Sequence, residues 1–140
     1  MFLLRPMADG DLNFIRATWM RELGHTRLGA WLGSTLADYA IIRDRCIQDG
    51  EVQVATLESE PTAVCGWACT EGPGVLHFVY VKERWRGNGL VRMLLSQLDP
   101  IDVTYTHRTK TCQNLPIPAT WTYRPLRAVR ALPLRAPSRG

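Results

Sequence analysis

Three segments with the composition of β-strands follow one another with almost no chain between them. Residues 51–57 alternate apolar and polar side chains, 62–70 are mostly apolar, and 75–81 are rich in valine and aromatic residues. The links at 59–61 and 72–74 contain proline or glycine, as tight turns do. Because parallel neighbours need a crossover of a dozen or more residues, these short links predict an antiparallel meander.

Helical periodicity flanks this meander on both sides. Apolar side chains recur every three or four residues over 11–23, over about 34–49, and again over 90–98. Short strand-like segments lie at 2–5 and 101–105. The order strand, two helices, three strands, helix, strand predicts an α/β (α+β) fold, with one mixed, mostly antiparallel sheet and helices on both faces.

Charge divides the chain into two unequal parts. Residues 1–102 hold all 13 acidic side chains and 10 of the 17 basic ones, whereas 103–140 hold seven basic side chains and no acid. Proline is also frequent after residue 115. We therefore expect a folded core at 1–107 and a Pro/Arg-rich extended C-terminal arm at 108–140. Such an arm could bind nucleic acid or another anionic partner, or be a solvated tail without a specific partner.

The location in the cell is predicted from what the sequence lacks. Apolar runs fall far short of the roughly 20 residues of a membrane helix. The first residues are broken by Arg5 and Pro6, which is unlike a secretory signal. We expect a cytoplasmic protein that does not enter a membrane.

Cysteine and histidine spacing does not predict a metal site. Cys65 and Cys69 form a C-x3-C pattern, which is not the C-x2-C of a zinc knuckle, and His77 and His107 do not complete a ligand set. The cysteines are expected to be reduced thiols. Strand alternation predicts that Cys65, Trp67 and Cys69 share one face, where free cysteine packs as a small apolar residue.

A strand that runs into a glycine-rich turn and then a helix, at 79–95, is the most informative stretch. This geometry aims several backbone N–H groups and the positive end of a helix at one point, which suits a phosphate or pyrophosphate. No Gly-Lys-Ser/Thr follows, which excludes a P-loop, and no G-x-G-x-x-G is present for a dinucleotide. The sequence therefore predicts an anion cradle of another kind.

The same stretch resembles the acyl-coenzyme A segment of the GNAT superfamily of N-acyltransferases, whose signature is Gln/Arg-x-x-Gly-x-Gly/Ala. Residues 84–89, Arg-x-x-Gly-x-Gly, match it literally. Residues 86–91, Arg-x-x-Gly-x-Val, fit less well at the last position but place the leucine pair 94–95 where the family has its buried pair. They also leave the family's usual four residues after Val81, so we prefer this second frame.

The resemblance implies a GNAT-like fold with acetyl-CoA as cosubstrate. It implies transfer of the acetyl group to an amine, here of unknown identity. Backbone groups of the fourth strand would bind the pantetheine arm, and backbone N–H groups of the turn would bind the pyrophosphate. The cofactor-binding residues implied in this way are Val79, Tyr80, Val81, Arg86, Gly87, Asn88, Gly89, Leu90, Val91 and Arg92.

The sequence identifies the catalytic residues of such an enzyme less clearly than its cofactor-binding residues. Family members have, after the fifth strand, a helix with a tyrosine that protonates the departing thiolate. Residues 106–140 show no clear version of it, so the C-terminal part is expected to be truncated or atypical. The catalytic candidates are Tyr123, in a loop-like run, and His77, a titratable group on the fourth strand that is also compatible with a purely structural role.

A second function remains open, that of a catalytically inactive GNAT-fold binding or assembly protein. Val91, the missing tyrosine helix and the arginine-rich arm favour it, whereas the intact Arg-Gly-Asn-Gly turn favours the enzyme. The chain also resembles a compact GNAT-like group of tailed phages around Arg5-Pro6, at 74–82 and at 115–118. This resemblance implies a phage-encoded protein of the host cytoplasm or the virion.

Overall fold

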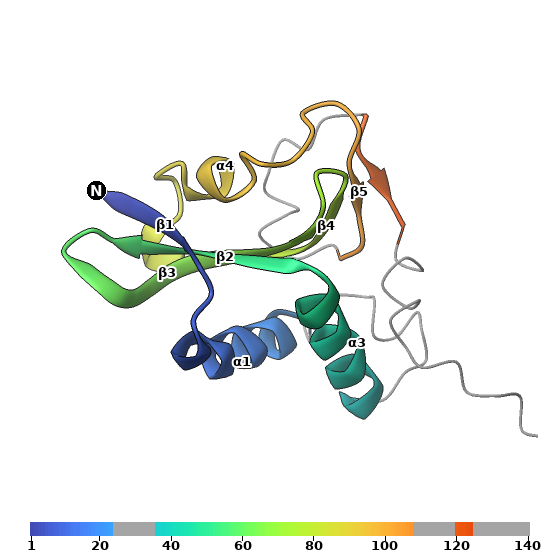
Figure 1. Cartoon of the computed structure of the whole chain (residues 1–140), viewed down its shortest axis with the longest axis horizontal. Coiled ribbons are helices and arrows are strands. Elements are labelled where there is room, and N and C mark those ends of the chain that lie inside the picture. The colour runs from blue at the N-terminus through green and yellow to red at the C-terminus, as the bar shows by residue number, and fades with distance from the viewer. Residues whose placement is uncertain (24–35, 108–119, 125–140) are drawn as a thin grey trace, which may run out of the picture.

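A computed structural model describes residues 1–23, 36–107 and 120–124, whose strands form one six-stranded sheet. Figure 1 shows how the helices and strands are arranged. The strands, in sequence order and in sheet order, are β1 (Phe2–Pro6), β2 (Glu51–Leu57), β3 (Glu60–Glu71), β4 (Val75–Val81), β5 (Thr104–Tyr105) and β6 (Thr122–Tyr123). Strands β1 to β4 pair antiparallel, and β5 and β6 join in parallel. The predicted mixed, mostly antiparallel sheet is confirmed.

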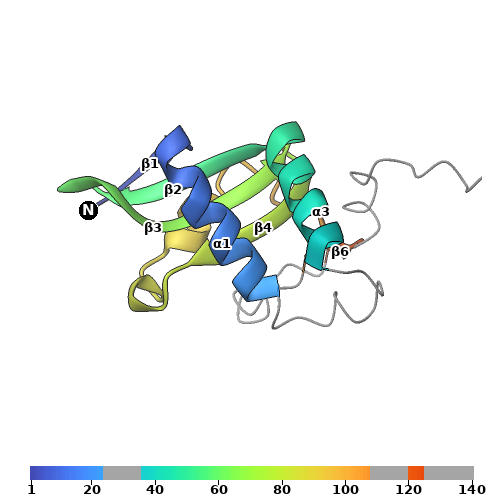
Figure 2. The same cartoon turned by 90° about the horizontal axis from the view of Figure 1, so that it is seen from below.

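Helices cover both faces of this sheet, as the sequence predicts. Helices α1 (Leu12–Leu23) and α3 (Leu36–Asp49) lie on one face, and α4 (Leu90–Leu94) lies on the other (Figures 1 and 2). Short 3₁₀ turns, η1 (Asp9–Asp11) and η2 (Glu83–Trp85), lead into α1 and toward α4. Because 108–119 and 125–140 lie outside the described residues, the arm and its boundary at 107 stay predictions. Within 120–124, β6 is a sheet strand that the sequence analysis did not predict.

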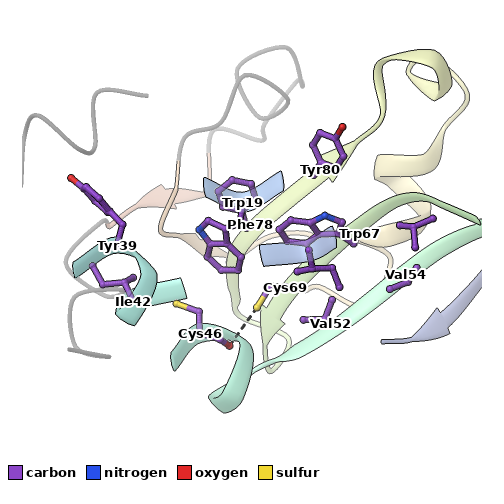
Figure 3. Close-up of a cluster of buried hydrophobic side chains, with 12 residues drawn as sticks. Trp19, Tyr39, Ile42, Cys46, Val52, Val54, Trp67, Cys69, Phe78 and Tyr80 are labelled. Carbon is purple, nitrogen blue, oxygen red and sulfur yellow. Dashed lines mark hydrogen bonds between the residues drawn. The ribbon is translucent and has the colours of Figure 1, made fainter. Parts of the chain in front are cut away.

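The core has two parts, one on each face of the sheet. On the α1 and α3 face, Trp19, Trp67 and Phe78 stack with ring centroids 4.6 to 5.6 Å apart, and all three are fully buried (Figure 3). On the α4 face, Leu90 and Leu94 pack against small and β-branched residues of β2 to β4. Trp67 also donates its indole N–H to the Thr18 hydroxyl at 2.9 Å, so that this buried donor is satisfied.

The prediction that the three residues at 65, 67 and 69 share one face is wrong. Trp67 and Cys69 pack on the α1 and α3 face, whereas Cys65 packs on the α4 face. The reason is an irregularity in the β2–β3 register, in which Ala55 pairs with Gly66 and Thr56 pairs with Val64, leaving Cys65 without an opposite residue. An extra residue of this kind reverses which face the following side chains occupy.

The helix expected at 90–98 is shorter than the stretch over which apolar residues recur with helical spacing. It ends at Leu94, and a turn continues it with Ser96 N–H bonded to Met93 C=O at 3.2 Å and Leu98 N–H bonded to Leu95 C=O at 3.0 Å. The Ser96 hydroxyl also donates to the Met93 carbonyl at 2.8 Å, which competes with continued helical bonding. The apolar periodicity correctly predicted that Leu98 is buried, since only 7% of it is exposed. It did not predict where the helix ends.

The strand expected at 101–105 is reduced to Thr104–Tyr105. The Asp99 carboxylate accepts the N–H groups of Ile101 at 2.8 Å and Asp102 at 3.2 Å. These two donors are therefore committed to a turn instead of the sheet. The same two hydrogen bonds lower the pKa of Asp99.

A bidentate ion pair ties β1 to the start of α1. Arg5 donates from Nη1 to Asp11 Oδ2 at 2.6 Å and from Nη2 to Oδ1 at 3.0 Å, and the Ala8 N–H donates to the same carboxylate at 2.8 Å. The Arg5 hydrogen bond is the main reason that the pKa of Asp11 is lowered. Asp11 is 7% exposed, so its charge depends on these partners.

We expect Asp11→Asn to lower the free energy of unfolding by about 2 kcal/mol, because hydrogen bonds to a charged group are worth roughly 1.5–3 kcal/mol. Urea unfolding at pH 7 measures the change. Asp9→Asn is the matched control, because Asp9 is in the same turn and exposed, and its effect should stay within about 0.5 kcal/mol. Equal stability of the two variants would show that the ion pair does not stabilise the fold.

Candidate functional site at the strand fork and glycine turn

Strands β4 and β5 pair over only two residues and then separate. Val75 pairs with Thr104 and Leu76 pairs with Tyr105, and within the described residues the pairing goes no further. The separation begins beside a β-bulge, because Cys69 of β3 opposes Phe78 while Thr70 opposes Leu76. A bulge bends and twists its strand, which turns the last part of β4 away from β5. This opening is called the fork below.

Beyond the fork, β4 has a hydrogen-bonded side and an open side. Lys82 N–H donates to Cys65 C=O of β3 at 2.9 Å. Because backbone groups alternate in direction along an antiparallel strand, Tyr80 faces β3 as well, whereas Val79 and Val81 face away from it. Of the three predicted pantetheine-binding residues, Val79 therefore presents both its N–H and its C=O group to the fork. Val81 presents its N–H, because its C=O accepts from Arg86 Nε.

The turn after β4 is shaped by two glycines. Gly87 has φ +83° and Gly89 has φ +79°, in the left-handed region that glycine adopts without steric cost. A Cβ at either position would meet no atom within 4 Å, so these glycines are required by backbone conformation and not by lack of space. Within the described residues, the N–H groups of 87–92 donate to no backbone carbonyl, which leaves them available to an anion.

Two of the predicted binding side chains support the turn instead of extending from it. Arg86 donates from Nε to Val81 C=O at 3.0 Å. Asn88 donates from Nδ2 to Trp85 C=O at 3.0 Å and to Arg86 C=O at 3.3 Å. These contacts fix the end of β4 relative to the turn, a role that the sequence motif alone did not reveal.

Positive charge predominates around this turn. Between residues 82 and 92 the chain has four basic side chains and one acidic one. Lys82 lies over the Phe14 ring, with Nζ 5.0 Å from its centroid, and Arg84 lies over the Trp85 ring at 4.9 Å. Arg92 is exposed on α4. The local field therefore favours a phosphate-bearing ligand over a neutral or cationic one.

Val91, which stands where the GNAT signature has a small residue, is half-buried and packs against the α4-side core. Its backbone N–H is among the free donors of the turn. Leu94 is buried but Leu95 is only half-buried, whereas the preferred motif frame implies a buried pair. The Val91 side chain therefore packs partly against the core.

The two catalytic candidates lie in different strands with β5 between them. His77 lies in β4 and is 2% exposed, and its ring bonds to Thr106 and Glu71. Tyr123 lies in β6, not in a loop, and its ring stacks on Tyr105 with centroids 5.3 Å apart. The structure therefore does not bring these two residues together.

Sequence reasoning missed His107 as a site residue. It is 2% exposed and lies two residues after the end of β5, where the fork opens. Burial, followed by the nearby charge of His77, lowers its pKa to about 3, so the ring is neutral at pH 7. No periodicity marks this position, because one histidine after a two-residue strand has no sequence pattern.

The comparisons with known proteins concern the fold. Within 1–23, 36–107 and 120–124, the elements give the α/β arrangement that the sequence predicts, one mixed sheet with helices on both faces. In the same ranges no helix is long and apolar enough to span a bilayer. In that described part of the chain, His, Cys, Asp and Glu side chains form no group of three that could hold a metal ion.

No protein-family model and no curated protein matches the chain. Three solved structures are similar to it. The apo form of YjaB from Escherichia coli is 16% identical over 69% of this chain and 63% of its own, with a TM-score of 0.48. A GCN5-related N-acetyltransferase from Rhodopseudomonas palustris is 18% identical over 67% and 61%, with a TM-score of 0.46.

The third is yncA from Salmonella typhimurium, a putative acetyltransferase solved with its cofactor acetyl-CoA. It is 21% identical over 70% of this chain and 61% of its own, with a TM-score of 0.46. The chain thus spans less than two thirds of the length of each of these three proteins. Likeness at this level does not extend an activity to this chain.

Proposed function

We propose that this protein is a GNAT-type N-acyltransferase that transfers an acetyl group from acetyl-CoA to an amine. The observation that supports this most is the juxtaposition of the fork with the glycine turn. The backbone groups of Val79 and the N–H of Val81 lead directly into six free N–H groups at 87–92. A ligand that joins an amide-bearing arm to a pyrophosphate fits both at once.

In this proposal the chain's main contribution is to hold the two reactants in place. Acetyl-CoA, when bound, supplies the thioester. Val79 and Val81 would hold the pantetheine amides in strand-like register, and the N–H groups of 87–92 would hold the pyrophosphate, with Arg86 and Asn88 keeping the turn rigid. Orientation of this kind, before any acid or base acts, supplies much of the rate of an acyl transfer.

Ligand binding tests the proposal directly. Acetyl-CoA at about 100 times its dissociation constant should add roughly 2.7 kcal/mol of stability, seen as a rise in Tm. ATP at the same concentration is the control, because it has the phosphates but lacks the pantetheine arm, and we expect a much smaller rise. Equal shifts with both ligands would show a general anion site, and no shift with either would remove the cofactor assignment.

An inactive binding or assembly protein is the second candidate. The observation that favours it is the position of Tyr123, since in the described part of the chain it is the tyrosine that follows β5 and it belongs to β6. Under this alternative the protein binds acetyl-CoA but releases no free coenzyme A with any amine. A phage or virion role for such a protein stays a prediction from sequence.

The basic arm provides a separate prediction about partners. Truncation after Tyr123 removes five arginines and no acid. We expect a change in Tm of a few degrees at most and a large loss of binding to a polyanion such as heparin, with wild-type binding falling steeply with salt. A Tm drop of ten degrees or more would show instead that residues after 123 are part of the core.

A further inference from the structure

Four polar side chains, from β3, from β4 and from the two residues that follow β5, form a continuous chain beside the fork. Glu71 Oε1 of β3 lies 3.5 Å from His77 Nε2, and His77 Nδ1 lies 3.0 Å from Thr106 Oγ1. Thr106 Oγ1 in turn lies 2.7 Å from His107 Nδ1. Both imidazoles and the hydroxyl are buried, with exposures of 2% or less, so their polar atoms need hydrogen-bond partners within the protein.

The chemistry of these groups fixes a direction for the hydrogens. An ionised carboxylate only accepts, so His77 Nε2 donates to Glu71, and in a neutral ring His77 Nδ1 must then accept. Thr106 has one hydroxyl proton, and His77 offers it two acceptors, the ring Nδ1 at 3.0 Å and the backbone carbonyl at 3.4 Å. We assign the proton to Nδ1, which is the nearer of the two. The Thr106 oxygen is then free to accept a hydrogen from His107 Nδ1. His107 Nε2 is left as the unprotonated nitrogen.

We propose that Glu71, His77, Thr106 and His107 form a directional hydrogen-bond relay that makes His107 Nε2 an acceptor for an N–H of the amine substrate at the fork. This inference rests on the proposed acyltransferase function and deepens it. It assigns to the chain a residue that orients the nucleophile. His107 contacts the amine, and Glu71, His77 and Thr106 are positioning residues that act through it.

The placement of His107 suits the nucleophile more than the cofactor. Its ring lies 5.4 Å from Trp19 of α1 and 5.5 Å from Phe78, between centroids, on the α1 and α3 face of the sheet. The glycine turn leads into α4 on the opposite face (Figure 1). A cofactor held on the α4 side leaves the α1 and α3 side of the fork for the amine.

A neutral ring is required for this role, and burial supplies it. His107⁺ would repel a protonated amine and would have no lone pair to offer. The pKa of His107, lowered to about 3 mainly by burial, keeps the ring neutral throughout the physiological range. The relay then selects between the two neutral tautomers, since Nδ1–H is the form that can donate to Thr106.

The opposite arrangement is chemically distinct. If Thr106 donates to His107 Nδ1, then His77 Nδ1 must donate to Thr106 and His77 becomes a cation paired with Glu71. His107 would then have its proton on Nε2, so it would offer an N–H to a substrate. The two arrangements differ in protonation at three of the four ring nitrogens, which are His77 Nδ1, His107 Nδ1 and His107 Nε2.

Imidazole ¹⁵N NMR of the full chain at pH 7 distinguishes the arrangements. We expect His107 as the Nδ1–H tautomer and His77 as neutral Nε2–H. Thr106→Val removes the hydroxyl with little change of shape and should release His107 from that tautomer, whereas Thr106→Ser keeps a hydroxyl and should retain it. A wild-type His107 with its proton on Nε2, or a cationic His77, would overturn the relay.

Kinetics test the role of the relay. Acetyl transfer to a panel of primary amines is followed as free coenzyme A thiol, and acetyl-CoA affinity is measured separately by calorimetry. With the best amine, His107→Gln and Thr106→Val should lower kcat/KM for the amine by at least tenfold while the Kd of acetyl-CoA changes less than twofold, and Thr106→Ser should recover most of the loss.

Failures of the two proposals are distinguishable. Absence of acetyl-CoA binding by a folded wild-type protein overturns the proposed function and, with it, the role of His107 in that reaction, whereas the NMR result on the relay stands by itself. Acetyl-CoA binding with unchanged amine kinetics in Thr106→Val, or with transfer to no amine of the panel, overturns the assignment of His107 to the amine.

Discussion

Gly89→Glu is expected to reduce acetyl-CoA binding below detection in calorimetry at concentrations that saturate the wild type. Gly89 has φ +79°, so any side chain there forces the turn out of shape, at a cost of roughly 1–2 kcal/mol. The glutamate also adds a negative charge beside the N–H groups proposed to hold the pyrophosphate. Like charges at such short range oppose binding strongly in a partly desolvated site.

Gly72→Glu is the matched control for this substitution. Gly72 also has a positive φ, +61°, and a Cβ there would also meet no atom within 4 Å. It lies in the exposed turn between β3 and β4. Both variants thus carry the same strain and the same charge. We expect similar losses of Tm in the two but normal acetyl-CoA affinity in Gly72→Glu. Equal affinity of the two variants would place the cofactor elsewhere.

Acid is expected to destabilise the protein through His107. In the unfolded chain this histidine has its ordinary pKa of 6.5, and in the folded chain its pKa is about 3 because the ring is buried. Between these values the unfolded state binds more protons than the folded state. Stability contributed in this way is therefore complete above pH 6.5 and is lost, by up to about 1.4 kcal/mol per pH unit, as pH falls toward 3.

Urea unfolding at several pH values between 4.5 and 7 measures this loss. His107→Gln removes the titrating group while keeping a polar side chain. The slope of its unfolding free energy against pH should therefore be smaller than that of the wild type, by the equivalent of about one bound proton. The comparison is between slopes, because the variant is expected to be less stable at every pH. Parallel curves for wild type and variant would show that His107 does not titrate between these limits.

How far the sequence predicts the fold depends on the type of element. Strands 51–57 and 75–81 have the predicted bounds in the structure, because alternation and short turns are local signals. Helix 90–98 was predicted too long, because periodicity reports burial and Leu98 stays buried in a turn. Strand β6 was not predicted, because two residues contain no period.

The candidate site divides in the same way. The glycine turn was predicted from Arg86 to Arg92, because positive φ requires glycine at fixed positions whatever surrounds them. The sequence could not show which of the three predicted pantetheine-binding residues face the fork, because that depends on the β3–β4 register. The hydrogen bond from Arg86 Nε to Val81 C=O is likewise visible only in the tertiary structure.

By itself, then, the sequence determined the meander, the helices around it and the glycine turn, all of which follow from local propensity and the period of apolar residues. Only the tertiary structure decided which face Cys65 occupies, where β4 separates from β5, and that Glu71, His77, Thr106 and His107 meet. The physical reason is that bulges and long-range contacts depend on register between strands. Register is set by the balance of many packing contacts across the sheet, which no single stretch of sequence contains.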